Sequence, residues 1–317
     1  KIVLEGEEEA GSPNLAGLLR RHKALLASDG WIIIDGPAHQ SGPPQLALGV
    51  RGDVNVDLIV YGPARPLHSG HYGNWAPNPA MMLAELLASM KDETGRVTIA
   101  GFYDDVVPLS EAEKRAIAAV PAPDEALRRD LALGWTEGAG STLTEAIQLP
   151  SLNINGLRSA DVGDKARNVV PTTATATLDL RLVMGNSPDR QIEKLVRHIR
   201  AQGYEVLDRE PTLEERRRFA RVATVRRQPG YPAERTRIEH PLVRDLTAAL
   251  RRQTEVAVLP SLGGSLPLYL IREELGAPTL VLGLWNHDNN QHAEDENIRL
   301  GHLWKGIAAV AAVMRMR

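Results

Sequence analysis

Strand and helix patterns alternate at both ends of this chain, and a block of different character separates them; this order is the feature that most limits the fold. Residues 15–27 have the apolar spacing of a helix, and residues 31–34 that of a short buried strand. Toward the carboxyl end, the patterns predict a helix, two strands and a final helix at residues 241–252, 257–259, 278–282 and 301–315. The simplest fold with this order is an α/β domain with a parallel-type sheet, made from both ends of the chain.

The block between the two ends has its own order of elements. Residues 54–61 and 174–183 alternate as strands do, and residues 152–154 form a shorter apolar run. Helical patterns occupy residues 79–90 and 189–200, so the order is that of a ferredoxin-like split βαβ unit. We therefore predict an inserted α+β domain over residues 48–233 and an α/β domain from residues 1–47 and 234–317.

The composition excludes several classes of protein. The 317 residues carry a formal net charge of -3, which is not the basic field that binds nucleic acid. The sequence contains no cysteine, so any metal site must use histidine and carboxylate ligands. We find no apolar run of about 18 residues and no signal peptide, so neither a membrane nor export is indicated, and cytoplasm is the default expectation.

An acidic turn follows an apolar run at the start of the chain. Residues 2–4 are apolar, and Glu7, Glu8 and Glu9 follow within a segment that contains two glycines. This order predicts a buried strand that places carboxylates on a turn, where a divalent cation would offset their repulsion. A solvated acidic loop is the alternative. The chain begins at Lys1 rather than at Met, inside the expected strand, so we expect an N-terminal portion to be missing.

Two histidines are candidates for the site. His292 lies in a polar loop, residues 286–297, between a strand and the last helix, where α/β domains place their sites. The acidic and amide residues of that loop could instead cap the final helix. His68 follows a strand of the inserted block, where a lone histidine is commonly a hydrogen-bonded structural residue.

Taken together, these segments resemble one family, the di-zinc metallopeptidases that include carnosine dipeptidase, acetylornithine deacetylase and succinyl-diaminopimelate desuccinylase. The resemblance covers nearly the whole chain. It rests on residues 5–12, 28–29, 62–70, 101–105, 167–171, 180–183, 263–267 and the loop of His292. The Gly-Phe-Tyr-Asp-Asp segment at 101–105 resembles the dipeptidase branch in particular.

The resemblance implies a catalytic domain with an inserted lid domain that forms a homodimer. Glu8 would be the general base, and it would take a proton from water bound to zinc and return it to the leaving amine. Glu9 and His292 would bind one zinc, and Asp29 the other. His68 would reach from one subunit into the site of the other and stabilise the oxyanion. Manganese and cobalt accept the same ligands as zinc.

The same resemblance implies a substrate with a free carboxylate, a dipeptide or an N-acyl amino acid. Arg181 is the expected partner of that carboxylate, with Asn168 and Ser265 as further contacts. For Arg181 the alternative is an ion pair on the sheet surface, and for the Gly263–Gly264 segment it is a plain tight turn.

One departure from the family pattern affects activity. The His-x-Asp ligand motif and the bridging aspartate of the family are found nowhere in residues 1–317. Because stable zinc sites usually need three or four ligands, we expect this chain alone to bind metal poorly and to be inactive. The alternative is a non-catalytic relative, or a subunit of a divided peptidase, with a binding or dimerisation role.

Overall fold

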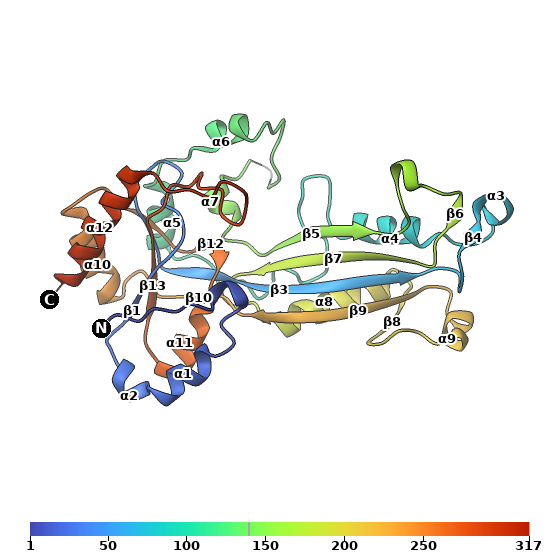
Figure 1. Ribbon diagram of the computed structural model, residues 1–317, viewed down its shortest axis with the longest axis horizontal. Helices are drawn as coiled ribbons and strands as arrows, with labels where there is room; N and C mark the ends of the chain where they lie inside the picture. The colour runs from blue at the N-terminus through green and yellow to red at the C-terminus, as the bar shows by residue number, and fades with distance from the viewer. Residues whose placement is uncertain (139, 317) are drawn as a thin grey trace.

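The computed structural model describes residues 1–138 and 140–316, and two large β-sheets follow one another along the longest axis of the molecule (Figure 1). The four-stranded sheet lies at the end that holds both termini. Its order is β1 (Trp31–Ile34), β13 (Thr279–Gly283), β2 (Gln45–Ala47) and β11 (Ala257–Leu259). β1 is parallel to β13 and β11 to β2, whereas β13 and β2 are antiparallel. The predicted parallel-type sheet is therefore mixed.

Helices cover both faces of this small sheet. They are α1 (Leu15–Arg21), α2 (Lys23–Leu26) and α11 (Leu268–Leu275) on one face, and α10 (Pro241–Arg251) and α12 (Leu300–Met314) on the other. Ile33 packs with Leu19 and Ile271 on the first side. Its neighbour Ile32 packs with Leu246 on the second. Successive side chains of a strand point to opposite faces, so a strand buried on both sides needs the unbroken apolar run seen in β1.

The second sheet is longer and forms the inserted part of the molecule. Its order is β5 (Ser151–Arg158), β7 (Thr173–Leu182), β3 (Gly49–Tyr61), β9 (Val222–Tyr231) and β8 (Glu205–Leu207). β3 is antiparallel to both β7 and β9. The order of elements matches the predicted split βαβ unit, with one difference. β9 was not predicted, and it occupies the place beside β3 while β8 lies outside it.

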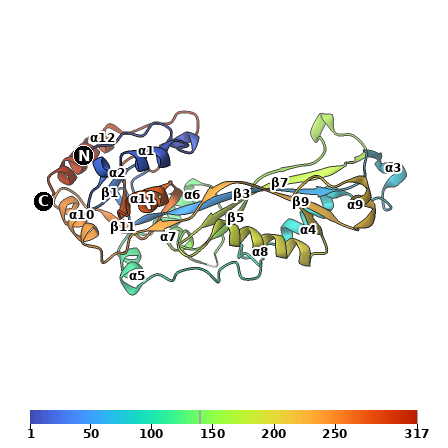
Figure 2. The ribbon, with the colours of Figure 1, turned by 90° about the horizontal axis from the view of Figure 1, so that it is seen from below.

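Only one face of the long sheet carries helices, as Figure 2 shows for α4 (Pro79–Ala88) and α8 (Pro188–Ala201). Val54, Val56 and Leu58 of β3 point toward this helical layer and are fully buried. The intervening side chains of β3, beginning with Asp53 and Asn55, point to the other face and are half-buried. The alternation that predicted these strands thus reflects one packed face and one polar face.

β3 joins the two sheets. It has thirteen residues, a length of about 40 Å at the usual rise of a strand. β10 (Glu234–Arg235) and β12 (Leu262–Ser265) pair with its first residues, Gly49 to Arg51, next to the four-stranded sheet. A Cβ on Gly49 would lie 1.9 Å from the carbonyl oxygen of Glu234, so the close approach of β10 requires glycine there.

The remaining elements lie outside the two large sheets and the helices that cover them. At the far tip of the long sheet, β4 (Leu67–His68) pairs with β6 (Val169–Val170) beside α3 (Ser69–Tyr72). The charged excursion predicted over residues 108–150 contains α5 (Glu111–Ala118), α6 (Asp124–Asp130) and α7 (Leu143–Ala146). The short elements are η1 (Glu8–Ala10), η2 (Gly163–Lys165) and α9 (Leu213–Arg218). None of the helices in the described residues is long and apolar enough to span a membrane.

Three local expectations need correction. Residues 2–4 form no strand, since they pair with no other strand and leave Ile2 and Leu4 75% and 92% exposed. The helix expected over residues 15–27 is divided at His22 into α1 and α2. The Gly263–Gly264 segment is not a tight turn but part of strand β12. The domain boundaries at residues 47/48 and 233/234 stay a prediction.

Truncation of a buried side chain should lower the free energy of unfolding far more than truncation of an exposed one. Leu178 on β7 is fully buried in the core of the long sheet. Leu178→Ala removes packing and leaves a cavity, so we expect a loss of about 2–5 kcal/mol in the free energy of unfolding. Denaturant unfolding measures this loss. Leu213→Ala, at an exposed leucine on α9, is the control and should change stability by less than about 0.5 kcal/mol; equal losses in the two variants would contradict the packing described here.

Candidate functional site

Glu8 and Glu9 lie on a short 3-10 helix whose local hydrogen bonds fix their direction. The backbone N–H groups of Ala10 and Ser12 donate to the carbonyl of Glu7, and the turn closes at Gly11, which has a φ of 81°. The amide of Asn14 donates to the carboxylate of Glu7 at 2.9 and 3.0 Å. Glu7 is thereby engaged with its own turn, and the next two carboxylates are left for other partners.

Glu9 lies beside His292. Its Oε2 is 3.6 Å from Nδ1 of the histidine, and the two side chains are 73% and 66% exposed. The pairing brings together the first turn of the chain and the loop before α12, as the two segments were predicted to meet. Carboxylate and imidazole in contact form a donor set that divalent transition metals accept.

Glu8 differs from Glu9 because it is half-buried. Burial raises the pKa of its carboxyl above the usual range, and the negative charges of Glu9, Asp35 and Glu5 raise it further. The nearby imidazole of His292 opposes this shift. A carboxyl with a raised pKa holds a proton more readily, as a group that shuttles protons near neutral pH must do.

Asp35, rather than Asp29, is the aspartate near Glu8. Asp29 precedes β1 and Asp35 follows it, so a four-residue strand separates them and they lie at opposite edges of the sheet. At the carboxyl edge, the carbonyl oxygen of Gly36 accepts a hydrogen bond from the backbone N–H of Leu284, where the segment leading to His292 begins. The charge of Asp35 acts on Glu8, whereas Asp29 is not among the groups that shift the pKa of Glu8. The sequence could have indicated Asp35, because it follows the strand and sites form at the carboxyl ends of parallel strands.

The loop that carries His292 is anchored by amide side chains. The fully buried Asn286 donates to the carboxylate of Asp288 and to the side-chain oxygen of Asn297, at 3.0 and 3.1 Å. Its own oxygen accepts from the backbone N–H of Arg299 at 2.9 Å. The predicted alternative, in which residues 295–297 cap the last helix, is wrong, because α12 begins after Arg299 and has no side-chain cap.

Arg181 and Ser265 meet where the two sheets join. Nη1 of Arg181 donates to Oγ of Ser265 at 2.9 Å, and Nε donates to Oδ2 of Asp179 at 3.0 Å. The side chain of Arg181 is one-third exposed, so part of its guanidinium faces solvent. A guanidinium has five N–H donors, and the remaining ones are available for a ligand.

Tyr231 connects this arginine to the acidic turn. The pKa of Tyr231 is raised to about 12 in total. Burial is the largest cause, the charges of Asp53 and Glu8 also raise the pKa, and the charge of Arg181 lowers it. The ring stacks on Tyr269 with 5.7 Å between centroids. The charges of both Glu8 and Arg181 act on the hydroxyl of Tyr231, so the acidic turn and the arginine lie near the same side chain.

His68 and Asn168 lie together at the far tip of the long sheet, away from the other candidates (Figure 1). The carbonyl of Asn168 accepts from the backbone N–H of Ser69 at 3.0 Å. Nδ1 of the exposed His68 accepts from the backbone N–H of Gly70 at 3.1 Å, so Nε2 is the nitrogen left for other partners. The tip and the acidic turn lie at different places along the sheet, and within one chain His68 does not reach Glu8.

The described residues do not assemble a complete metal centre. Within residues 1–138 and 140–316, no group of three or more histidine, aspartate or glutamate side chains lies close enough to hold a metal ion. Glu9 and His292 are in contact, whereas neither Asp29 nor Asp35 joins them in such a group. The donors that are in contact fit a divalent metal by their chemistry and would supply two of its ligands.

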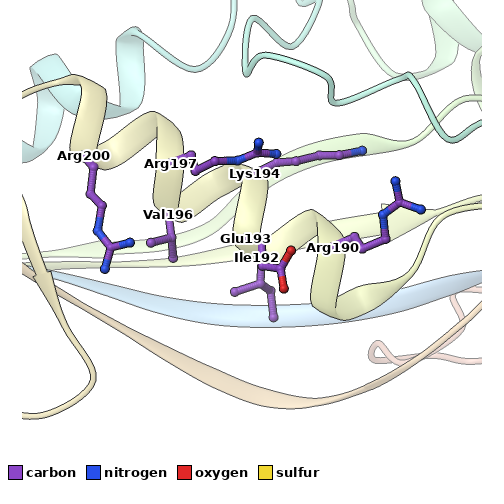
Figure 3. A pocket seen from close by; sticks show the side chains of 7 residues that line it. All are labelled: Arg190, Ile192, Glu193, Lys194, Val196, Arg197 and Arg200. Atoms are coloured by element: carbon purple, nitrogen blue, oxygen red, sulfur yellow. The ribbon is translucent and has the colours of Figure 1, made fainter.

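A concavity of about 530 Å³ lies along α8 (Figure 3). Its lining residues all belong to that helix: Arg190, Ile192, Glu193, Lys194, Val196, Arg197 and Arg200. Asp105 forms ion pairs with both Arg190 and Lys194. None of the predicted site residues lines this concavity, so we assign it no part in the chemistry.

Known proteins are similar to this chain over nearly its whole length. The model of the peptidase dimerisation domain, M20_dimer, matches residues 48–206. The Beta-Ala-His dipeptidase of Rattus norvegicus is 26% identical over 320 residues, which cover 98% of this chain and 62% of that protein. The Cys-Gly metallodipeptidase DUG1 of Candida albicans is 26% identical over 318 residues, with 96% and 62% covered. The chain therefore spans 62% of the length of each of these relatives.

Solved structures share the fold. The M20 family metallo-carboxypeptidase Sso-CP2 from Sulfolobus solfataricus superposes with a TM-score of 0.80 and 28% identity, covering 98% of this chain and 69% of that one. Human carnosine dipeptidase 1 superposes with a TM-score of 0.77 and 23% identity, covering 97% and 64%. An α/β peptidase fold with an inserted domain, predicted from the sequence, is confirmed.

The position of Asp35 can be tested in the chain without any ligand. Asp35→Asn removes a negative charge near Glu8, so we expect the pKa of Glu8 to fall toward its ordinary value. Carbon-13 NMR titration of the Glu8 carboxyl measures the change. Asp29→Asn is the matched control and should leave the pKa of Glu8 unchanged; a fall caused by Asp29→Asn and not by Asp35→Asn would reverse the assignment.

Proposed function

This chain belongs to the M20 peptidase family through its dimerisation domain, and from that membership we propose that it serves the metal-dependent hydrolysis of an amide bond in a dipeptide or N-acyl amino acid. The single observation that supports this chemistry best is the environment of Glu8. A half-buried carboxyl with a raised pKa lies next to the Glu9–His292 pair. A proton-transfer group beside metal-binding donors is an arrangement suited to metal-dependent hydrolysis of an amide.

In this proposal Glu8 takes a proton from the attacking water and later gives it to the leaving amine. Its raised pKa suits both steps, because the carboxyl is a better base and holds the proton long enough to deliver it. Glu9 and His292 would hold one divalent ion, and Asp35 is the better candidate than the predicted Asp29 for a further ligand. Zinc, manganese or cobalt bound there would polarise the substrate carbonyl and acidify a water molecule.

Arg181 and Ser265 would bind and orient the substrate. A free carboxylate of the substrate would pair with the exposed N–H groups of Arg181, while Ser265 and Asp179 hold the guanidinium in place. Such an anchor favours substrates that end in a carboxylate, such as a dipeptide or an N-acyl amino acid. Beta-Ala-His and Cys-Gly, in the names of the relatives, are dipeptides of this kind.

The remaining candidates, His68 and Asn168, would act in the second subunit of a homodimer. β5 forms the long outer edge of the sheet, and its side chains from Asn153 to Arg158 are exposed. Ile154 and Leu157 are apolar and uncovered on this edge. Pairing of two such edges about a two-fold axis would bury them and carry the tip of one subunit toward the other. In that position His68 would stabilise the oxyanion of the partner's reaction.

Glu8 can be tested in the full-length gene product. Glu8→Gln keeps the shape of the side chain but removes its basicity, so we expect kcat for a dipeptide to fall by about 10²–10⁴-fold with little change in metal content. Steady-state kinetics and elemental analysis measure the two quantities. Glu7→Gln, on the same turn but bound to Asn14, is the matched control and should stay active.

Retained turnover in Glu8→Gln would overturn the role of Glu8. A wild-type protein that binds metal and hydrolyses nothing would instead favour the non-catalytic alternative. The expectation that residues 1–317 alone bind metal poorly stays a prediction, and the metal content of that purified chain tests it.

The dimer is tested by charging the exposed edge. Leu157→Lys puts a positive charge on the apolar edge of each subunit, which the pairing of two edges would have to bury, so we expect the wild-type dimer to become a monomer. Multi-angle light scattering at micromolar concentration measures the mass. Leu25→Lys, at an equally exposed leucine on α2, is the control. A wild-type monomer, or a Leu157→Lys dimer, would exclude this edge as the interface.

A further inference from the structure

Two aspartates lie on either side of the predicted substrate arginine. Asp53 is on β3 and Asp179 is on β7, and the register pairs Asp53 with Arg181 and Asp179 with Asn55. Residues two apart on a strand share a face, so all four side chains point to the open face of the long sheet. Asp53 and Asp179 occupy diagonal positions of this antiparallel pair, a spacing that long side chains can bridge.

The hydrogen bonds of this cluster leave two oxygens without a donor. Oδ2 of Asp179 accepts from Arg181 at 3.0 Å, and Oδ2 of Asp53 accepts from the amide of Asn55 at 3.4 Å. The Oδ1 atoms of both aspartates are buried, and within the described residues neither has a hydrogen-bond partner. Oδ1 of Asp53 lies 3.9 Å from Nε of Arg181, which is an ion-pair distance but too long for a hydrogen bond. The carboxyls of Asp53 and Asp179 are within hydrogen-bond reach of each other, and such a pair is satisfied most simply when one of the two carries a proton.

The charges around Asp53 agree with this interpretation. The pKa of Asp53 is raised to about 6: burial raises it most, the charge of Arg181 opposes the shift, and the neighbouring carboxyl of Asp179 adds to it. Tyr231 stays neutral at physiological pH, since its pKa is raised to about 12. The titratable and charged groups that face the cluster are Arg51 on β3, Asp179 and Arg181 on β7, Tyr231 on β9, Tyr269 on α11 and Glu8 on the first turn.

A second arginine completes the charge balance. Arg51 is buried, and its Nη2 donates to the carbonyl of Leu149 and to Oγ of Ser151 at 2.9 and 2.8 Å. Burial and the charge of Arg181 lower its pKa to about 10, so it is still charged at neutral pH. Arg51 and Arg181 together carry two positive charges. With both aspartates ionised the four groups have no net charge, and with one shared proton they have a net charge of +1.

We propose that Asp53 and Asp179 share one proton, and that this proton sets the net positive charge which Arg181 offers to a substrate carboxylate. The inference rests on the proposed function, in which Arg181 binds that carboxylate. Asp53 and Asp179 are positioning residues, since they act through the arginine and do not touch the reacting atoms. Binding of a carboxylate substrate is then coupled to uptake of a proton, and the affinity falls as the pH rises through the titration of Asp53.

The test measures binding rather than turnover. The probe is the dipeptide Gly-Gly, and its C-terminal amide is the control ligand because it lacks the carboxylate. Between pH 5.5 and 7.5 the protonated fraction of a group that titrates near pH 6 falls about 25-fold, so the apparent Kd of Gly-Gly should rise by up to that factor. Calorimetry in two buffers of different ionisation enthalpy should detect proton uptake at pH 7, and the amide ligand should bind without it.

Asp53→Asn should abolish both the pH dependence and the proton uptake. Asp57→Asn is the matched control: Asp57 lies on the same face of β3, accepts a hydrogen bond from Thr177 at 2.6 Å, and should leave both unchanged. An equal Kd of the wild type at both pH values, or pH dependence that survives in Asp53→Asn, would overturn the proposal.

A measurement on the unaltered chain guards against a variant that fails to fold. Carbon-13 NMR titration of Asp53 should give a midpoint well above the usual aspartate value of 3.8, and an ordinary midpoint would overturn the proposal. The two ideas can fail separately. Dipeptide hydrolysis without coupled proton uptake refutes only the shared proton, whereas proton-coupled binding without hydrolysis in the full-length protein refutes only the proposed function.

Discussion

The continuity of β3 is the constraint on which the rest of the structure depends. Its first residues are held by β10 and β12 at the four-stranded sheet, and its last residues reach toward the far tip of the molecule. Because a strand is stiff, the polar side chains along it have fixed places. Asp53 lies at the junction of the two sheets, next to the predicted substrate arginine, while His68 follows the opposite end. The separation of the candidate residues into groups is therefore a property of one strand.

Charged side chains gather where the two sheets join, on the face of the long sheet that α4 and α8 do not cover. One face of the long sheet is packed under α4 and α8, and the other is open where β12 and the first turn of the chain approach it. Arg51 and Asp179 are buried there, and each of these ionisable side chains needs partners that compensate for its loss of contact with water. Buried charges are costly unless they are paired and hydrogen-bonded, so this cluster is more than a surface ion pair. Arg181 does form ion pairs with Asp179 and Asp53, as the alternative interpretation expects, but these side chains are mostly buried rather than exposed on the sheet surface.

The sequence predicted those parts of the fold that periodicity controls. The strand at residues 31–34 and the helices over residues 79–90 and 189–200 were found because one or both faces are packed, and packing leaves a regular apolar pattern. β9 was missed, since its middle carries the exposed residues Arg226, Arg227 and Pro229, which break the apolar alternation. The apolar residues 2–4 gave the opposite error, since a strand was predicted there and none is found. An apolar run becomes a strand only when a neighbouring strand is there to pair with it. Composition does not distinguish Asp29 from Asp35, since both flank β1. The direction of the strand does, because sites form at the carboxyl ends of parallel strands and Asp35 follows β1.

The dimensions of the molecule also limit how its two ends can cooperate. Glu9 and His292 meet near the four-stranded sheet, whereas His68 and Asn168 lie beyond the far end of a strand of about 40 Å. The long sheet would have to fold back on itself to bring them together, and its packed core of buried leucines and valines resists such bending. A second copy that is antiparallel to the first removes the difficulty, because the tip of each long sheet then points toward the acidic turn of the other. In such a pair, the length of the sheet that separates His68 from Glu9 within one chain would bring His68 of one chain toward Glu9 of the other.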